Sequence, residues 1–198
     1  MLKDNYTTVN IRDYLLNNHS EIAGEQMLIN LFSGFSCPLN PNVEKFLKEN
    51  AISFTKKNQS VTYLVFSNKT ATLVGYFTLA IKPITVNSTV FSNTIRKKLL
   101  RIGKIDADKQ ELYLSAYLIA QLGKNYSKNA NAQITGKQLL EIAITEVKKL
   151  QYRAGGVAVF LESENNPKLR QLYVEENDFK EFGIRIDEET LVQMLKLL

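Results

Sequence analysis

The feature that most constrains the fold is a mostly apolar run over residues 111–122, followed by a polar loop and an amphipathic helix. This run is too apolar for an edge strand, since it contains Leu112, Tyr113, Leu114, Ala116, Tyr117, Leu118, Ile119 and Ala120. The spacing over 136–151 predicts a helix with one apolar face, and the residues 157–161 predict the next strand. Two strands joined by a helix predict a crossover connection in which the helix covers one face of the sheet.

The rest of the chain adds strands and helices on both sides of this crossover. Further strands are expected over 61–66, 71–81 and 179–186. Helices are expected over 11–17, 26–32, 43–52, 93–103 and 167–176. The tail over 191–197 fits either a strand or a helix. This order predicts an α/β (α+β) fold with a mixed central sheet of about six to seven strands and helices on both faces.

A single domain is expected, because neither an internal repeat nor a linker divides the 198 residues. Its expected parts are an N-terminal helical part over 1–60, a hairpin and central strands over 61–122, and a core over 123–186. The chain contains no uninterrupted apolar run of about 18 residues and no apolar signal segment at its start. We therefore expect no membrane span and a cytoplasmic location.

Composition excludes several kinds of chemistry. One cysteine (Cys37) allows no internal disulfide, and one histidine (His19) leaves too few ligands for a structural zinc site. His19 also lies in a polar stretch far in sequence from any nucleophile motif, which argues against a histidine-based triad. We expect no metal, and a reaction that depends on positioning, backbone dipoles, a tyrosine or a carboxylate.

The charge distribution favours an anionic ligand. The 25 Lys and Arg residues exceed the 20 Asp and Glu residues, which gives a net charge of +5. Four cations fall within the expected helix over 93–103, at Arg96, Lys97, Lys98 and Arg101. The alternative for this helix is a solvated charged face, and for the whole chain it is solubility alone.

A candidate diphosphate site lies where the loop after the apolar strand enters the helix over 136–151. Unpaired backbone N–H groups at a helix start attract phosphate without any special side chain. Gly136 lets a ligand approach the backbone, and Lys128 and Lys137 add positive charge. The alternative is an ordinary helix start.

Three segments together resemble the acetyl-CoA-binding core of the GCN5-related N-acetyltransferases, the GNAT superfamily. They are Tyr117–Gly123, Thr135–Leu140 and Asn166–Tyr173. The family's phosphate signature, Gln/Arg-x-x-Gly-x-Gly/Ala, falls on 131–136, where the last glycine matches and Ile134 replaces the first. The family's second-helix pattern meets Asn166, Leu169 and Tyr173, and its following Gly-Phe pair is Asp178-Phe179 here.

The N-terminal half is similar to a narrower branch of this family, the acetyltransferase toxins of bacterial toxin–antitoxin pairs. The matching segments are Phe35–Cys37, Phe46–Lys48, Ser60–Val65 and Gly75–Leu79. Toxins of this branch acetylate the α-amino group of aminoacyl-tRNA. The resemblance therefore implies a GNAT fold with a V-shaped opening between the fourth and fifth strands, which receives acetyl-CoA.

The resemblance also implies roles for individual residues. The backbone of Leu118, Ile119 and Ala120 would pair with the pantetheine arm of acetyl-CoA. The diphosphate would contact the loop residues Asn131, Ala132, Gln133, Ile134, Thr135, Gly136 and Lys137. Tyr173 would be the general acid for the departing thiolate, although a core tyrosine is the alternative. Asn166 would bond the pantetheine, cap its helix, or do both.

The general base and the acceptor site are less specified. Glu162 and Glu164 lie at the end of the strand expected over 157–161. There they either deprotonate the amine through water or are solvated carboxylates. An aminoacyl ester has an α-amino group that is already largely neutral, so a mechanism without a base is a further alternative. The four cations Arg96, Lys97, Lys98 and Arg101 are the expected contacts to tRNA phosphates.

The sequence thus predicts an acetyl-CoA-dependent N-acetyltransferase in which a primary amine attacks directly. Its most specific acceptor is the α-amino group of aminoacyl-tRNA, and a protein or small-molecule amine is the alternative acceptor. Because Ile134 replaces a signature glycine, a catalytically degenerate CoA-binding module is a second hypothesis. The expected partners are acetyl-CoA, tRNA and a small antitoxin protein, and a homodimer is left open.

Overall fold

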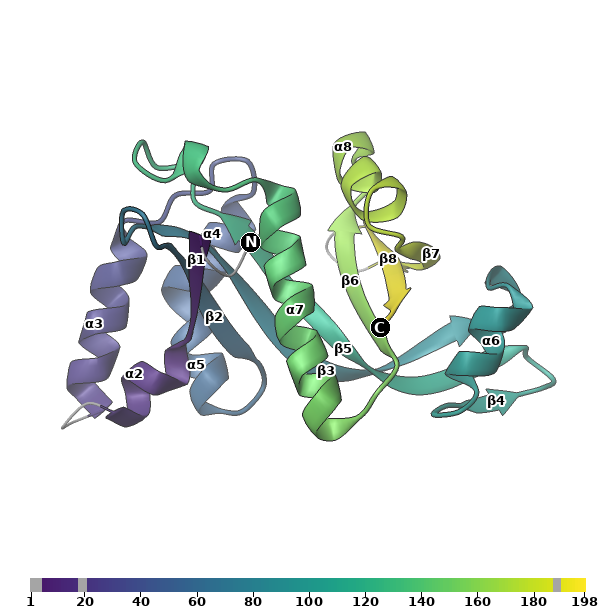
Figure 1. Ribbon diagram of the computed structural model, residues 1–198. Helices are drawn as coiled ribbons and strands as arrows, with labels where there is room; N and C mark the ends of the chain where they lie inside the picture. Colours follow the sequence, from purple (N-terminus) through teal and green to yellow (C-terminus); the bar gives the residue numbers. More distant parts are fainter. Residues whose placement is uncertain (1–4, 18–20, 187–189) are drawn as a thin grey trace. The chain divides into compact units, whose positions relative to one another are not determined.

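The structure is a computed structural model that describes residues 5–17, 21–186 and 190–198 (Figure 1). His19, discussed above, lies outside these ranges. The chain divides into two compact units: unit 1 comprises 1–80 and 121–143, and unit 2 comprises 81–120 and 144–198. The expected single domain stays a prediction, and the unit boundaries divide two of its three expected parts. Within the described residues, no helix has the length and apolar character needed to span a membrane.

Unit 1 combines the N-terminal helices with the first strands of the sheet. Its helices are α2 (Ile11–Asn17), α3 (Glu21–Ser33), α4 (Pro41–Lys45), the π-helical turn η1 (Phe46–Asn50), α5 (Ala51–Lys56) and the 3₁₀ turn η3 (Asn131–Gln133). Its strands are β1 (Tyr6–Asn10), β2 (Val61–Ser67) and the first part of β3 (Leu73–Asn87). It also holds the end of β5 (Glu111–Lys124) and the start of α7 (Gly136–Ala154).

Unit 2 holds the rest of β3, β5 and α7. It also holds the elements between β3 and β5 and those that follow α7. Its helices are η2 (Ser88–Val90), α6 (Asn93–Leu99), α8 (Pro167–Arg170) and the π-helical turn η4 (Gln171–Glu175). Its strands are β4 (Lys104–Asp106), β6 (Ala158–Glu164), β7 (Lys180–Ile186) and β8 (Thr190–Leu197). The helix expected over 167–176 is therefore present as α8 followed by η4.

The strands form an eight-stranded mixed sheet with the order β1-β2-β3-β5-β6-β8-β7, and β4 pairs with β5 outside this path. β5 and β6 are parallel, and the other recorded pairs are antiparallel. The predicted mixed α/β fold is confirmed. The strand count was too low, because β1 and β4 were not expected. The ambiguous tail is a strand, β8, which pairs with β6 on one side and β7 on the other.

The core of unit 1 explains two of its glycines. Leu28, Phe32, Leu47, Leu64 and Tyr76 are buried together. A Cβ atom on Gly123 would lie 2.6 Å from both Tyr76 Cε1 and Val43 Cγ1, and one on Gly75 would lie 3.0 Å from the Gly123 carbonyl oxygen. These glycines let β3 and the end of β5 approach closely, because any side chain there would clash.

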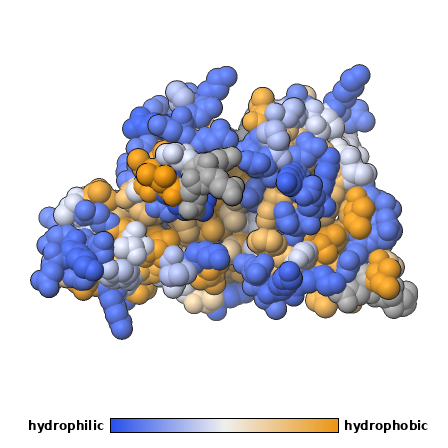
Figure 2. Space-filling model, turned by 180° about the vertical axis from the view of Figure 1, so that it is seen from behind, coloured by the Kyte–Doolittle hydropathy of each residue, from blue (hydrophilic) through white to orange (hydrophobic). Residues whose placement is uncertain are grey.

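The core of unit 2 is built from β3, β5, β6, β7 and β8 together with α6. It contains Ile84, Val86, Phe91, Leu99, Leu112, Leu114, Ala116, Ala158, Phe160, Phe182 and Leu195. Leu99 is fully buried, which fixes the basic helix α6 by its apolar side. Hydrophobic residues outside the cores form several groups among hydrophilic ones on the face shown in Figure 2.

Candidate functional site

The loop before α7 is anchored by two buried side chains. Ala130 is fully buried, and Ile134 is only 2% exposed. Ile134 has φ −144° and ψ 146°, an extended conformation that any residue adopts. The loop therefore does not need a glycine at position 134, because the isoleucine serves as its apolar anchor.

Thr135 and Gln138 form a reciprocal cap at the start of α7. The Gln138 backbone N–H donates to Thr135 Oγ1 over 3.1 Å, and the Thr135 backbone N–H donates to Gln138 Oε1 over 2.9 Å. Such a capping box satisfies two of the backbone donors that a helix start leaves unpaired. The first fully helical residue is Gly136, as the sequence predicted.

Two side chains that are distant in sequence hold the same loop, one from β1 and one from the turn between β2 and β3. The Tyr6 hydroxyl, on β1, donates to the Gln133 carbonyl over 2.6 Å. The Thr70 hydroxyl donates to Gln133 Oε1 over 2.7 Å. Burial raises the pKa of Tyr6, which keeps its hydroxyl a donor. Residues 131–137 all belong to unit 1, together with these supports. The Thr-x-x-Gln spacing could have indicated Gln138, whereas the sequence holds no signal for Tyr6 or Thr70.

In unit 2, the parallel register between β5 and β6 is short. It covers three pairs, Tyr117↔Val159, Leu118↔Phe160 and Ile119↔Leu161. β6 continues to Glu164, and over all seven of its residues it pairs with β8. Leu118 and Ile119 thus lie inside the paired stretch, and Ala120 is the first residue beyond the recorded register.

Among the tyrosines of unit 2, Tyr173 is the one whose pKa is raised most strongly. It is 7% exposed, and its ring contacts Phe179 edge-to-face with centroids 6.1 Å apart. Burial raises the pKa of Tyr173 to about 12. Its hydroxyl has no hydrogen-bond partner among the described residues. The hydroxyl oxygen is not fully enclosed either, so it reaches the surface. The geometry gives a neutral phenol with an unused donor.

The residues around Tyr173 fit their expected structural roles. Asn166 caps α8, since its side-chain oxygen accepts from the Lys168 backbone N–H over 2.9 Å. Pro167 follows as the first helical residue. Asp178, in the place of the family's glycine, has φ +58°, a left-handed conformation that favours glycine.

Glu162 is held by two partners on the strands of unit 2. Gln193 Nε2 donates to its Oε1 over 2.7 Å, and Arg185 Nε lies 3.1 Å from its Oε2. Both carboxylate oxygens therefore have a partner. Its role as a base stays a prediction.

The four predicted phosphate-contacting cations lie on and just after α6. Ser92 caps this helix through a bond to the Ile95 backbone N–H. Arg96 is half-buried, and Lys97, Lys98 and Arg101 are exposed. Across the described residues, none of the four forms an ion pair. Their charges are available to an anionic partner.

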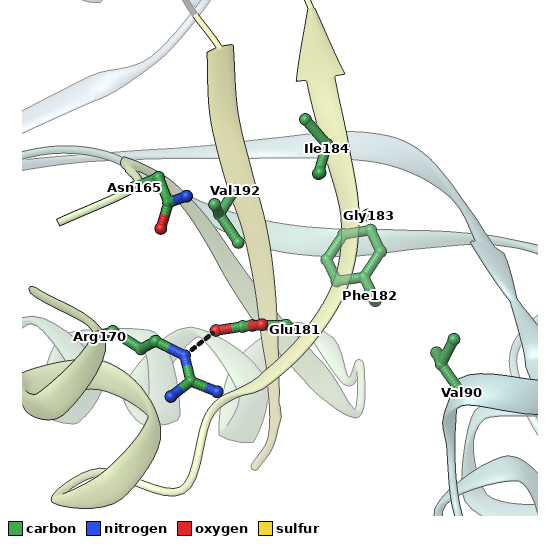
Figure 3. A pocket seen from close by; sticks show the side chains of 8 residues that line it. All are labelled: Val90, Asn165, Arg170, Glu181, Phe182, Gly183, Ile184 and Val192. Atoms are coloured by element: carbon green, nitrogen blue, oxygen red, sulfur yellow. Dashed lines mark hydrogen bonds and ion pairs between the residues drawn. The ribbon is translucent and has the colours of Figure 1, made fainter. Parts of the chain in front are cut away.

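A cavity of about 310 Å³ lies in unit 2 beside β7 and β8 (Figure 3). Its polar side is the pair Arg170–Glu181, with Nε 2.7 Å from Oε1, and its apolar side includes Phe182, Ile184 and Val192. None of the site residues predicted from the sequence lines it. It is therefore separate from the predicted site.

The order of strands, the β5–β6 crossover through α7 and the following α8 define the fold of the GCN5-related N-acetyltransferases. The predicted GNAT fold is thus confirmed. The solved structures that it resembles include the toxin AtaT, which has also been solved with the C-terminus of its antitoxin AtaR, in agreement with the narrower sequence resemblance. The sequence itself matches no protein-family model and no curated protein.

Three similar structures cover nearly the whole chain. AtaT complexed with acetyl-methionyl-tRNAfMet is 16% identical with a TM-score of 0.63, over 94% of this chain and 93% of that chain. A KacT mutant with one tyrosine changed to phenylalanine is 18% identical with a TM-score of 0.62, over 98% and 95%. AtaTR bound with AcCoA is 15% identical with a TM-score of 0.58, over 98% and 94%.

Proposed function

We propose that this protein is an acetyl-CoA-dependent N-acetyltransferase that acetylates the α-amino group of aminoacyl-tRNA. The observation that carries the proposal is the short register of β5 and β6, which stop pairing after Ile119 and Leu161. Parallel neighbours in a sheet normally keep their ladder, and backbone groups that leave it need another partner. The pantetheine arm, which has two amides, is a suitable partner.

Within each unit, taken by itself, there are candidate groups for one part of acetyl-CoA. In unit 2, the backbone of Ala120 is the first candidate for the pantetheine, while Leu118 and Ile119 already share a register with β6. In unit 1, the start of α7 and the braced loop over 131–137 are the candidate for the diphosphate, through backbone N–H groups and the helix dipole. AtaTR bound with AcCoA supports this choice of donor.

The reaction needs little from the protein beyond positioning and one hydrogen-bond donor. The neutral amine nitrogen attacks the thioester carbonyl, the C–S bond breaks, and the thiolate leaves with its electron pair while the amine loses a proton. A thiol has a pKa near 8.5, well below the pKa of about 12 that burial gives Tyr173. Tyr173 is therefore proposed to stabilise the thiolate by a hydrogen bond, with the final proton coming from the amine.

No carboxylate base is required in this proposal. A free α-amino group has a pKa near 7.7–8.0, so a substantial fraction is neutral at physiological pH. Both carboxylate oxygens of Glu162 already have a partner, Gln193 and Arg185, and no proton transfer to it is part of the proposal. Deprotonation of the acceptor by solvent before binding is sufficient.

The similar structures support the proposed acceptor and the proposed partner protein. AtaT has been solved with acetyl-methionyl-tRNAfMet and, as a tyrosine-to-phenylalanine mutant, with the C-terminus of the antitoxin AtaR. In this chain, Arg96, Lys97, Lys98 and Arg101, which form no ion pair with any other described residue, are proposed to contact tRNA phosphates. We also propose a small antitoxin as a partner.

Thiol release from acetyl-CoA tests this function. The protein is mixed with charged tRNA, uncharged tRNA, a peptide N-terminus and small amines, and the free thiol is measured. We expect release with charged tRNA, and a kcat about 10²-fold lower for Tyr173→Phe with unchanged acetyl-CoA affinity. Tyr152→Phe, at a site that is 93% exposed, is the matched control and should keep full activity.

The same assay separates the competing functions. Acetyl-CoA binding in calorimetry without thiol release from any acceptor would identify a CoA-binding module instead of an enzyme. Release with a peptide or small amine but not with charged tRNA would assign the alternative acceptor class.

A further inference from the structure

The side-chain amide of Asn125 makes more buried hydrogen bonds than the proposed function explains. Asn125 is the first residue after β5 and is 2% exposed. Its Nδ2 donates to the Leu73 carbonyl over 2.8 Å. Its Oδ1 accepts from the backbone N–H of Ser36 over 3.1 Å and of Ser127 over 3.0 Å. One amide thus joins β3, the segment after α3 and the loop before α7, all within unit 1.

The bond to Ser127 sets the path of the loop. The Ser127 carbonyl accepts from the backbone N–H groups of Ala130 and Asn131, both over 3.0 Å. Ala130 is fully buried, and its own carbonyl accepts from the Gln133 N–H over 3.0 Å. A chain of hydrogen bonds therefore runs from Asn125 to η3, directly before the start of α7.

The bond to Ser36 connects a second segment to the same amide. The Ser36 carbonyl accepts from the Tyr126 N–H over 2.7 Å, so both the N–H and the carbonyl of Ser36 are hydrogen-bonded. Its neighbours Phe35 and Cys37 are buried, and Phe35 contacts Tyr76 edge-to-face with ring centroids 5.2 Å apart. The segment 34–37 and the loop over 127–135 thus share one anchor.

We propose that Asn125 is a positioning residue that fixes the diphosphate loop and couples it to the segment 34–37. This inference rests on the proposed function, since it assigns the loop to the diphosphate of acetyl-CoA. Loss of the amide releases the Ser127 and Ser36 peptides together, because each gives its N–H to the same oxygen. Ligand binding at the loop therefore stabilises the segment 34–37 as well.

The chemistry requires both halves of the amide. An asparagine offers an acceptor oxygen with two lone pairs and two N–H donors, whereas an ionised aspartate only accepts. Asn125→Asp keeps the acceptor for Ser36 and Ser127 but turns an oxygen toward the Leu73 carbonyl. Asn125→Ala removes all three bonds. Both variants lose stability, but only the alanine variant frees the loop.

Amide hydrogen exchange at Ser36 and Ser127, together with calorimetry of acetyl-CoA binding, tests the proposal in the full chain. For Asn125→Ala we expect faster exchange at both amides and an acetyl-CoA Kd raised about tenfold. For Asn125→Asp we expect both amides protected and a Kd within about twofold of the wild type. Thr78→Val is the control, since it removes the buried Thr62–Thr78 hydroxyl bond of unit 1 without touching the loop.

An unchanged Kd in Asn125→Ala, or equally weakened binding in the aspartate and alanine variants, would overturn the proposal. If the alanine variant does not fold, the aspartate variant decides, and a Kd raised more than about twofold there would overturn the proposal. A wild type that does not bind acetyl-CoA would instead refute the proposed function. Coupled exchange at the two amides would then support the anchoring role, and independent exchange would overturn it.

Discussion

Tyr173 is the residue in which burial and chemistry are most closely linked. A phenol this deeply buried stays neutral, since burial penalises the phenolate. The same effect keeps the hydroxyl a donor throughout the physiological pH range. It also makes the tyrosine a poor source of a fully transferred proton, which is why we assign it a hydrogen bond to the thiolate.

Alkaline unfolding should report the burial of Tyr173. Because its folded pKa of about 12 lies above the ordinary value of 10.0, its stabilising effect is complete below pH 10 and is lost as pH rises toward 12. The free energy of unfolding should fall by about 2–3 kcal/mol from this residue over that window. Tyr173→Phe should show a smaller fall, while Tyr76, whose pKa burial also raises, still contributes. Identical alkaline losses in both proteins would contradict this.

At the same scale, sequence motifs singled out Tyr173 and Asn166, whose roles in a site stay predictions, but missed the supports of the loop. Asn166 to Tyr173 is a short spacing within one helical segment, so a pattern can detect it. Tyr6 and Gln133 are 127 positions apart, and Thr70 and Gln133 are 63 apart. Hydrogen bonds over such separations leave no local pattern, because they depend on how the sheet is assembled.

The start of α7 shows how one element depends on its cap. Gln138→Ala removes the acceptor of the Thr135 backbone N–H and leaves that donor unpaired. We expect the free energy of unfolding to fall by about 1 kcal/mol in urea denaturation. Gln138→Glu keeps the acceptor and places a negative charge at a helix N-terminus, so its stability should match the wild type. An equal loss in both variants would refute the capping role.

Element boundaries were predictable where an apolar pattern repeats over many residues. They were unpredictable where the element is short. The helix expected over 136–151 is α7, which ends three residues later, at Ala154. β1 has five residues and runs directly into α2, so neither a turn residue nor a clear alternation marks it. The apolar spacing of the tail fits two periods, and only pairing with β6 and β7 makes it a strand.

For the whole molecule, the four cations on and just after α6 predict how the proposed activity depends on salt. Each phosphate contact releases counterions, so binding of tRNA weakens as salt rises. Changing all four cations to alanine should raise the KM for charged tRNA and make its log–log salt slope shallower by up to about three. Acetylation of a small amine should be unaffected. The four changed residues are Arg96, Lys97, Lys98 and Arg101.

A charge-matched control distinguishes a specific surface from net charge. Four exposed lysines elsewhere are changed to alanine, namely Lys45, Lys57, Lys69 and Lys148. This variant has the same net charge as the α6 variant, so a general electrostatic effect would lower tRNA affinity equally in both. A specific role for α6 requires the larger loss in the α6 variant, measured as KM at several salt concentrations.

The central claim is acetyl transfer to the α-amino group of aminoacyl-tRNA, and the most direct test follows the acetyl group itself. The protein is incubated with acetyl-CoA carrying a labelled acetyl group and with charged or uncharged tRNA, and the released aminoacyl product is identified by mass spectrometry. We predict label on the amino nitrogen from charged tRNA and none on uncharged tRNA. Folded protein that leaves charged tRNA unlabelled would contradict the claim.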